Sequence, residues 1–502
     1  MNTHPDFPSK ACLPHIIPQP AKMTLGQEYV DLSEFKLDAP DSPPAIKKLF
    51  LNTFPLREDG EKTLKLIKND QLKPESYTAD IAADHISVSA SDDRGFFYAF
   101  QTMRQLTYGG HITAATIEDQ PKLGIRGSHF NLGTVKMLDF DDLKQIIKML
   151  AKFKMNTLVL EYTDRFPFEK HPAIPSPAAF TKEQTLELEQ LATENYIDVI
   201  PLVQSLGHMR HVLRHPEYHH LLECELPVDR KSNEQFCPLT TGSLELFQAL
   251  ALEVMKVHPN SRYLHVGADE SRCLGICPKC AEFVKQHGKN KLYIDYLNKV
   301  CKWVKSQGRI PILWDDMLSH NPETVDTLDK DAVIMYWDYW TTTEKSPILV
   351  ARGAGYGVVS DKRWRTEWAS ELEEPQRTIV NNFSRGIDLA NDLGDNYMEN
   401  FGQYLGPDFP KYMSAFPNLG FLADKGFQVI GGPTTLGNRI DETFGLPNFN
   451  RFLGNIREFS AACIRHQALG LVTTAWYNFP PEILPFGIMV TAQSTWSGVA
   501  SS

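Results

Sequence analysis

The stretch Ser261-Arg-Tyr-Leu-His-Val-Gly-Ala-Asp-Glu270 decides how the rest of the chain is interpreted. A short apolar run, Tyr263 to Val266, predicts a buried parallel strand that ends at Gly267. Two neighbouring carboxylates, Asp269 and Glu270, follow the glycine, where the backbone can bend and bring both side chains toward one cleft. The alternative is an ordinary polar turn after a strand, which the acidic pair alone does not exclude.

Apolar runs alternate with helical patterns from Ile125 onward, which is the sequence form of a βα repeat. The first helix carries an apolar stripe with lysines between its members: Leu143, Ile146, Ile147, Leu150 and Phe153. We expect strands near residues 125–132, 156–160, 197–203, 263–266, 310–314, 332–336, 427–430 and 470–476. Eight strands with helices between them predict a (β/α)8 TIM barrel, whose chemistry lies at the C-terminal ends of the strands.

The seventh strand is ambiguous, because Tyr356 to Ser360 competes with Phe427 to Ile430 for its place. Roughly ninety residues separate the sixth strand from Phe427, more than any ordinary connection. We therefore expect a large insertion within residues 341–426, rich in aromatic and acidic residues and placed to cover the active-site mouth. Residues 1–120 read as a separate small α/β domain, with a hairpin at 76–90 and a helix after Asp92, and residues 121–502 form the barrel domain.

The composition is that of a folded protein, with 42% hydrophobic and 23% charged residues in 502. A net charge of −11 argues against a nucleic-acid or anionic-membrane partner. The first twenty residues lack the apolar core of a signal peptide, and no apolar run is long enough to span a bilayer. We therefore expect a cytoplasmic protein, although a trimmed export signal would leave the same sequence. The sequence does not specify an oligomeric state.

Three of the eight cysteines follow the acidic pair in the stretch Cys273-Leu-Gly-Ile-Cys277-Pro-Lys-Cys280. This spacing of Cys273, Cys277 and Cys280 could clamp a loop around structural zinc. A closed zinc site needs a fourth ligand, for which Cys224, Cys237 or a histidine are candidates. A loop with thiols that bind no metal is the alternative.

Polar residues at the predicted C-terminal strand ends form a set. They are Arg126, then Glu161, Tyr162 and Asp164, then Gln204 to His208, and then Trp314-Asp-Asp316, Trp337-Asp-Tyr339 and Trp476-Tyr-Asn478. Tryptophans beside carboxylates suit a sugar pocket, because apolar sugar faces pack on aromatic rings while hydroxyls form charge-assisted hydrogen bonds. Packing in the barrel core is the alternative for any single tryptophan, although barrel cores prefer branched aliphatic side chains.

The pattern His265-x-Gly267-x-Asp269-Glu270 resembles the signature of glycoside hydrolase family 20, the β-N-acetylhexosaminidases. The resemblance implies that Asp269 steers the acetamido group of the substrate and that Glu270 is the acid/base. It covers nearly the whole chain, since residues 75–106 resemble the end of the small domain that precedes the barrel in this family. Three segments are most similar to the branch that contains the intracellular hexosaminidase D type: residues 160–167, 200–208 and 313–317.

The same resemblance implies roles at other strand ends. Arg126 would hold sugar hydroxyls, Asp164 and His208 would support the catalytic Glu through hydrogen bonds, Trp314 and Trp337 would wall the acetamido pocket, and Trp476 would lie under the sugar ring. Tyr339 is the candidate for the tyrosine that donates to the acetamido oxygen. Two departures bear on substrate choice: Asn131 stands where the first strand often carries Asp, and Asn478 replaces a common Glu, for which Glu482 could substitute.

These features predict an exo-acting retaining β-N-acetylhexosaminidase that removes terminal β-linked GlcNAc or GalNAc from glycans or glycoconjugates. In this family the acetamido oxygen of the substrate attacks the anomeric carbon, so neither a cofactor nor a catalytic metal is expected. The expected partner is a small-molecule glycan substrate. One alternative is a metal-dependent barrel hydrolase, prompted by His265, Asp269 and the histidines at 208, 211, 215 and 219. The other is a non-catalytic glycan-binding protein on the same fold, against which the intact acidic pair argues.

Overall fold

The computed structural model describes residues 15–133, 138–224, 234–436, 448–476 and 481–498. The chain folds into two compact units. One unit comprises Met1–Gly124 together with the short segments Ala151–Met155 and Ala492–Ser502. The other comprises Ile125–Leu150 and Asn156–Thr491. The structure thus assigns two short later segments to the N-terminal unit.

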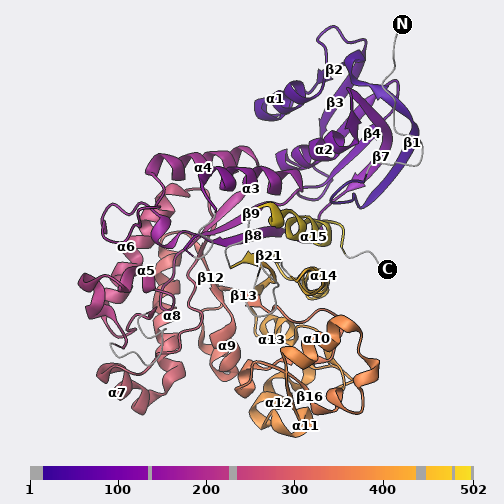
Figure 1. The fold of residues 1–502 in the computed structure, drawn as a ribbon. Helices are drawn as coiled ribbons and strands as arrows, with labels where there is room; N and C mark the ends of the chain where they lie inside the picture. Colours follow the sequence, from indigo (N-terminus) through magenta and orange to yellow (C-terminus); the bar gives the residue numbers. More distant parts are fainter. Residues whose placement is uncertain (1–14, 134–137, 225–233, 437–447, 477–480, 499–502) are drawn as a thin grey trace. The chain divides into compact units, whose positions relative to one another are not determined.

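The N-terminal unit is built on a mixed sheet with helices packed against it (Figure 1). Its strands occur in the order β1 (Lys22–Asp31), β7 (His111–Asp119), β4 (Tyr77–Ile81), β5 (Ile86–Ala90), β3 (Lys62–Lys68) and β2 (Phe35–Asp38), and β6 (Thr107–Tyr108) pairs with β7. The hairpin predicted at 76–90 is β4 and β5, which pair antiparallel. The helix predicted after Asp92 is α2 (Asp93–Leu106), whose first turn is capped by the Asp92 side chain. Helix α1 (Pro44–Thr53) contacts α2.

A buried charged cluster ties the two later segments to this sheet. The Nζ atom of Lys154 lies 2.7 Å from Oδ2 of Asp119, and neither side chain is exposed to solvent. The same carboxylate accepts hydrogen bonds from the hydroxyl of Tyr77 and from Nε1 of Trp496, each at 2.7 Å. Asp119 at the end of β7 therefore joins residues from three separate parts of the sequence.

The second unit contains a closed barrel of eight parallel strands. The strands are β8 (Ile125–Asn131), β9 (Thr157–Glu161), β10 (Asp198–Leu202), β11 (Tyr263–His265), β12 (Ile310–Trp314), β13 (Val333–Trp337), β19 (Gln428–Gly432) and β21 (Gly470–Ala475). Pairing of β21 with both β19 and β8 closes the ring, and the short β20 (Thr434–Leu436) adds to β21. All eight strands lie where the apolar runs predict them, so the (β/α)8 fold is confirmed.

Helices alternate with the barrel strands and cover them (Figure 1). The main ones are α3 (Phe140–Lys152), α4 (Lys182–Glu194), α6 (Thr241–Val257), α8 (Lys289–Ser306), α13 (Pro417–Asp424), α14 (Phe449–Arg465) and α15 (Leu484–Trp496). Thr181 and Gln184 form a capping box at the start of α4. The barrel interior is filled by one or two apolar side chains from each of several strands, among them Val159, Ile200, Ile312, Met335 and Val472.

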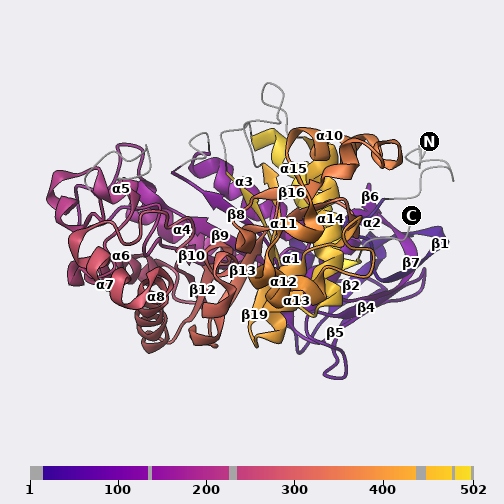
Figure 2. The ribbon, with the colours of Figure 1, turned by 90° about the horizontal axis from the view of Figure 1, so that it is seen from below.

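The ambiguity over the seventh strand is resolved by the sheet pairing. Strand β19 pairs with β13 and β21 inside the barrel. The competing run contributes β16 (Val358–Asp361), which belongs to a separate sheet with β15 (Ile348–Val350) and β17 (Arg385–Ile387). Between β13 and β19 the chain also forms α10 (Glu374–Asn382), α11 (Leu389–Asp392) and α12 (Asp395–Phe401), seen in Figure 2. This segment has its own apolar core around Trp364.

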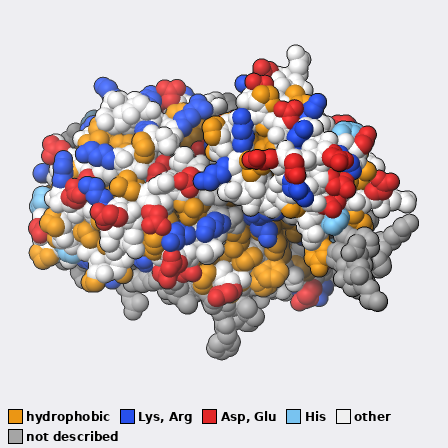
Figure 3. Space-filling view, turned by 90° about the horizontal axis from the view of Figure 1, so that it is seen from above, with side chains coloured by type: hydrophobic (Ala, Val, Ile, Leu, Met, Phe, Trp, Pro, Cys, Tyr) orange, Lys and Arg blue, Asp and Glu red, His pale blue; other side chains and the backbone are white. Residues whose placement is uncertain are grey.

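The surface shows no large area of a single charge on the face drawn in Figure 3, where Lys and Arg side chains are interspersed with Asp and Glu. Among the described residues, no helix is both long and apolar enough to cross a membrane. The expected cytoplasmic location stays a prediction.

Candidate active site

The chain bends sharply just beyond β11, as Gly267 led us to expect. Gly267, Ala268 and Glu270 have φ angles of +63°, +70° and +45°. A Cβ atom on Gly267 would lie 1.8 Å from Oε1 of Gln204, so only glycine fits there. The hydroxyl of Tyr293 donates to the carbonyl of Ala268 at 2.9 Å and helps to hold this strained backbone. Left-handed non-glycine residues cost free energy and cluster at functional sites, which makes this turn the first candidate for one.

The bend brings Asp269 and Glu270 to the same histidine. Nε2 of His208 lies 3.2 Å from Oδ2 of Asp269 and 3.6 Å from Oε2 of Glu270. Burial lowers the pKa of His208, but the two carboxylates outweigh it and raise the pKa to about 10. The imidazole is therefore a cation at neutral pH, placed between two acids.

Each carboxylate has a distinct environment. Oδ1 of Asp269 is buried and has no hydrogen-bond partner among the described residues. Glu270 is more exposed, and one of its oxygens pairs with the guanidinium of Arg272 at 2.5 Å. The backbone N–H of Glu270 donates to Oδ2 of Asp316 at 2.9 Å. Burial and the neighbouring Asp269 carboxylate raise the pKa of Asp316 to about 7.

A hydrogen-bond network links the C-terminal ends of the neighbouring strands β8, β9 and β10. Oε2 of Glu161 accepts from Nδ2 of Asn131 at 2.7 Å, and Oε1 accepts from Nε2 of Gln204 at 3.0 Å. Nε2 of His129 lies 3.4 Å from Oε2 of Glu161. Burial raises the pKa of Glu161, but the histidine and the hydrogen bonds outweigh burial and lower it. Asn131, which stands where the family often has Asp, thus serves here as a donor to a buried carboxylate.

The predicted aromatic residues come together at the strand ends. Nε1 of Trp476 donates to the hydroxyl of Tyr339 at 2.9 Å, and the Tyr339 ring lies 5.0 Å from that of Trp337. The ring of Trp314 lies 5.9 Å from that of Trp476. Trp314 is only 1% exposed and packs in the barrel core, whereas Trp337 and Trp476 are half-buried and offer ring surface.

A cavity of about 810 Å³ opens beside Glu270. Its lining includes Glu270, Asp316, Trp337, Trp340, Arg352 and Tyr356. Arg352 comes from the insertion: its guanidinium carbon lies 3.8 Å from the Trp337 ring centre, and Nη1 lies 3.1 Å from Oδ2 of the buried Asp315. The insertion therefore borders the cavity next to the acidic pair.

Arg126 occupies a place that does not support its expected contact with sugar hydroxyls. It is the second residue of β8, five residues before Asn131, or about 16 Å along the strand. Its register partner is Leu471, whereas the next pair, Gly127 and Val472, belongs to the interior face. Because successive side chains alternate, Arg126 points away from the barrel interior, where it is fully buried.

Asp164 also differs from the expectation. Its Oδ2 lies 3.2 Å from Nη2 of Arg214. Within the part of the chain that the structure describes, no hydrogen bond or ion pair joins Asp164 to His208. Glu161, the last residue of β9, contributes to the raised pKa of His208 instead.

Two further candidates have different outcomes. Asn478 lies outside the described residues. The histidines 208, 211, 215 and 219 do not form a metal-binding group: among the described residues, the one group with suitably close ligand atoms is Glu223, Cys237, Cys277 and Cys280. A histidine cluster that would support a metal-dependent hydrolase is therefore not found among the described residues.

Sequence reasoning gave no role to three residues that hold the site together: Arg352, Tyr293 and Arg272. Arg352 lies in the insertion and Tyr293 on α8, far in sequence from any motif. Arg272 follows Glu270 by two residues, so its proximity was a usable signal. A buried arginine over a tryptophan ring has no comparable signature in the sequence.

Residues 126–364 match the model of the glycosyl hydrolase family 20 catalytic domain, and residues 13–120 match that of glycosyl hydrolase family 20, domain 2. Hexosaminidase D of Bos taurus is 34% identical over 207 residues, which are 39% of this chain and 58% of that protein. Hexosaminidase D of Homo sapiens is 32% identical over 208 residues, 39% of this chain and 41% of that protein. The match thus spans less than two thirds of either relative.

Solved structures share the fold. A β-N-acetylhexosaminidase from Bacteroides fragilis has a TM-score of 0.69 at 18% identity, covering 97% of this chain and 92% of the other. An exo-β-N-acetylglucosaminidase from Vibrio harveyi, in complex with N-acetylglucosamine, has a TM-score of 0.68 at 18% identity, covering 98% and 75%. Because the models of the catalytic domain and of domain 2 match residues 126–364 and 13–120, the chain belongs to glycosyl hydrolase family 20.

Proposed function

We propose that this protein is an exo-acting, retaining β-N-acetylhexosaminidase that removes terminal β-linked GlcNAc or GalNAc by substrate-assisted catalysis. The observation that carries the proposal is the asymmetry of Asp269: His208 holds Oδ2, and Oδ1 is a buried acceptor without a partner among the described residues. Buried acceptors are normally satisfied, so an unsatisfied one beside a candidate acid calls for a donor from a ligand. The N–H of an acetamido group is such a donor.

The reaction would begin with attack on the anomeric carbon by the acetamido carbonyl oxygen of the substrate. As the glycosidic bond breaks, Glu270 gives its proton to the leaving oxygen. Asp269 accepts the hydrogen bond from the N–H, whose positive charge grows as the oxazolinium ring forms, and an anionic carboxylate stabilises that charge. Water then attacks the anomeric carbon from the other face, Glu270 takes its proton, and the acetamido group is restored with net retention.

Aromatic residues would position the sugar. The half-buried rings of Trp337 and Trp476 offer the apolar surface on which a pyranose face packs. Trp476 donates to the Tyr339 oxygen, which leaves the hydroxyl proton of Tyr339 to donate to the acetamido oxygen.

The comparisons support GlcNAc as the first substrate to test, since the similar Vibrio harveyi protein is an exo-β-N-acetylglucosaminidase. We would measure hydrolysis of 4-nitrophenyl β-N-acetylglucosaminide and its galacto epimer, with and without a thiazoline mimic of the oxazoline intermediate. We expect hydrolysis that the thiazoline inhibits competitively. Hydrolysis that the thiazoline leaves unchanged would contradict acetamido participation. Binding of N-acetylglucosamine without release of nitrophenol would contradict an enzyme and favour a glycan-binding protein.

A further inference from the structure

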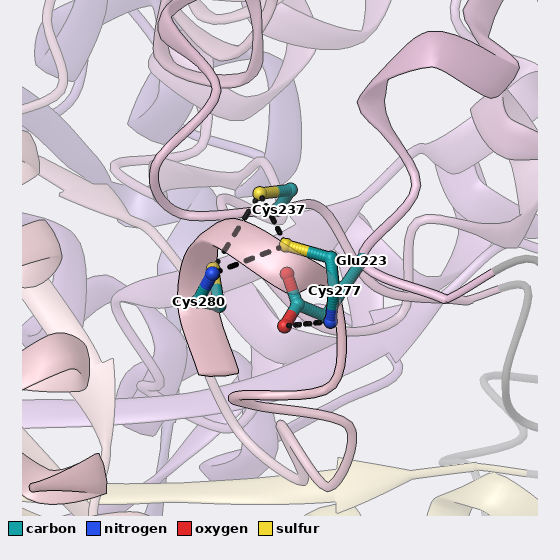
Figure 4. Close-up of side chains that lie close together, drawn as sticks. All are labelled: Glu223, Cys237, Cys277 and Cys280. Atoms are coloured by element: carbon teal, nitrogen blue, oxygen red, sulfur yellow. Dashed lines mark hydrogen bonds between the residues drawn. The ribbon is translucent and has the colours of Figure 1, made fainter. Parts of the chain in front are cut away.

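Three thiols and one carboxylate converge in a part of the barrel unit that the proposed reaction does not use (Figure 4). Sγ of Cys237 lies 3.6 Å from Sγ of Cys277 and 3.6 Å from Sγ of Cys280. One carboxylate oxygen of Glu223 completes the group, and the four ligand atoms all lie within 4.8 Å of one another. Cys237, Cys280 and Glu223 are buried, and Cys277 is partly exposed.

Two loops supply these residues. Glu223 and Cys237 flank an antiparallel bridge between Leu222 and Phe236, in the connection from β10 to α6. Cys277 and Cys280 begin α7 (Pro278–His287) in the connection after β11. The Cys277 sulfur accepts a hydrogen bond from the backbone N–H of Cys280 at 3.4 Å, so the first turn of the helix orients it. Each loop therefore supplies two of the four side chains, and the side chains of the two loops lie close together (Figure 4).

Glu223 is held as a ligand would be. Its Oε1 accepts hydrogen bonds from the backbone N–H groups of Gly275, Ile276 and Cys277 at 2.9, 2.8 and 3.3 Å. Its Oε2 is buried and has no hydrogen-bond partner among the described residues. Burying a carboxylate is costly unless its lone pairs are used, so a buried, half-satisfied glutamate beside three thiols is well suited to binding a cation.

We propose that Glu223, Cys237, Cys277 and Cys280 bind one Zn²⁺ ion as a closed, four-coordinate structural site. Zinc takes thiolate sulfur at about 2.3 Å, and tetrahedral angles then place sulfur atoms about 3.8 Å apart, close to the distances found here. Thiolate ligands select zinc over the oxygen-seeking cations Mg²⁺ and Ca²⁺. With four protein ligands the site leaves no open position for substrate, so its role is structural.

The site differs from the one that the cysteine spacing suggested. Cys273 is not a member of the group. Its backbone N–H donates to Oε1 of Gln235 at 2.8 Å, a second tie between the same two loops. A disulfide is a different use of paired cysteines, but the sulfur separations of 3.6 Å exceed an S–S bond, and the described cysteines form none.

The proposed zinc would fasten the loop that carries Asp269 and Glu270 to the connection after β10. The zinc ligands Cys277 and Cys280 follow the acidic pair by fewer than a dozen residues. Removal of zinc would loosen the end of this loop. The expected effects are a lower melting temperature and, through the loop, a lower kcat, although zinc takes no part in the chemistry.

The decisive experiment measures zinc in protein produced in zinc-supplemented medium and purified without chelator. Inductively coupled plasma mass spectrometry should find about one zinc per chain in the wild type. Cys277→Ser and Cys280→Ser should lose it, and Glu223→Gln should bind it at least about 10-fold more weakly. Cys273→Ser is the matched control, a buried cysteine of the same loop that should keep its zinc.

Cobalt substitution of the wild type covers the case in which the cysteine variants fail to fold. Tetrahedral Co²⁺ bound by three thiolates should show intense visible ligand-field bands and thiolate charge-transfer absorption in the near ultraviolet. Wild-type protein that contains no zinc and gives no such bands with cobalt would overturn the proposal. So would a Cys273→Ser variant that loses zinc as completely as Cys277→Ser. Because the readout is metal content, it does not depend on whether the proposed glycosidase activity is correct.

Discussion

Nε2 of His208 lies 3.2 Å from Oδ2 of Asp269, and this contact gives the two oxygens of the Asp269 carboxylate different environments. The oxygen beside the imidazole is neutralised, whereas Oδ1 stays a buried acceptor. The same nitrogen lies 3.6 Å from Glu270, so a single cation orients both acids of the pair. His208 is thus a positioning residue whose charge determines the geometry of the site.

His208→Gln should lower kcat/KM by about 10²-fold, because the carboxylates lose the charge that orients them. The pKa of His208 is raised to about 10, above that of an unfolded histidine. The stability that the charged imidazole contributes is therefore fully present below about pH 6.5 and lost as pH rises through about 10. We would compare melting temperatures and kcat/KM of variant and wild type across this range. His219→Gln, at an exposed position, is the control. An equal stability difference at every pH would contradict a charged His208.

Glu270→Gln should lower the turnover of an unactivated disaccharide by about 10²–10⁴-fold, because no group protonates the leaving oxygen. An aryl leaving group of low pKa needs no such proton, so the first step on an activated nitrophenyl glycoside should suffer much less. The measurement is kcat/KM for both substrates, which reports the first step, with Kd for a product sugar to show that binding persists. Glu282→Gln, on the exposed face of α7, is the matched control. Near-normal turnover of the disaccharide by Glu270→Gln would remove this residue from its assigned role.

Asp269→Asn should show whether Asp269 orients and stabilises the acetamido group or acts as the general acid. The amide keeps the shape of the side chain but removes the negative charge opposite the developing oxazolinium, so kcat should fall by about 10²–10³-fold on activated and unactivated substrates alike. Inhibition by the thiazoline should weaken in parallel. We would measure kcat with both leaving groups and the inhibition constant. A defect confined to unactivated substrates would show that Asp269 acts as the acid instead.

The barrel was predictable because its strands are buried on both faces and therefore read as continuous apolar runs between amphipathic helices. The seventh strand was not decided by that signal, since Val358–Asp361 pairs in a small sheet of the insertion and has the same apolar character. The two candidate strands are distinguished only by the strands with which they pair, and those partners lie far away in the sequence. The bend after Val266 was predictable from Gly267, because the left-handed backbone there suits glycine.

The proximity of His208, Asp269 and Glu270 was predictable, because a motif and its strand position agreed for each of them. For Arg126 the resemblance assigned a role in binding, whereas the two-residue alternation of β8 directs the side chain away from the barrel interior, so its role stays a prediction. Arg352 was missed for another reason. It contacts Trp337 from an insertion, and the βα repeat of the barrel does not determine how that insertion folds. The same applies to Cys237 and Glu223, which a bridge between distant residues brings to the cysteines of α7.

Asp316→Asn should change how stability depends on pH. Burial raises the folded-state pKa of Asp316 to about 7, whereas an unfolded Asp titrates near 3.9. The folded protein holds this proton more tightly, so the free energy of unfolding should fall as pH rises from about 4 to about 7. Asparagine keeps an acceptor for the Glu270 N–H and cannot ionise. The melting temperature of the variant relative to wild type should therefore increase between about pH 5 and pH 8. A constant difference would show that Asp316 is ionised throughout.

Asp119→Asn should destabilise the N-terminal unit by about 3–5 kcal/mol, because it leaves the ammonium of Lys154 buried opposite a neutral group. The asparagine can still accept some of the hydrogen bonds from Tyr77 and Trp496, so the loss reports the charge above all. Glu118→Gln is the matched control: it removes a neighbouring charge of β7 whose partner, Lys22, is largely exposed, and it should cost at most about 1 kcal/mol. Chemical denaturation followed by the fluorescence of Trp496, with the other tryptophans as background, measures both. If the Asp119 and Glu118 variants lost the same amount, the buried ion pair would not be what fastens the C-terminal segment to this sheet.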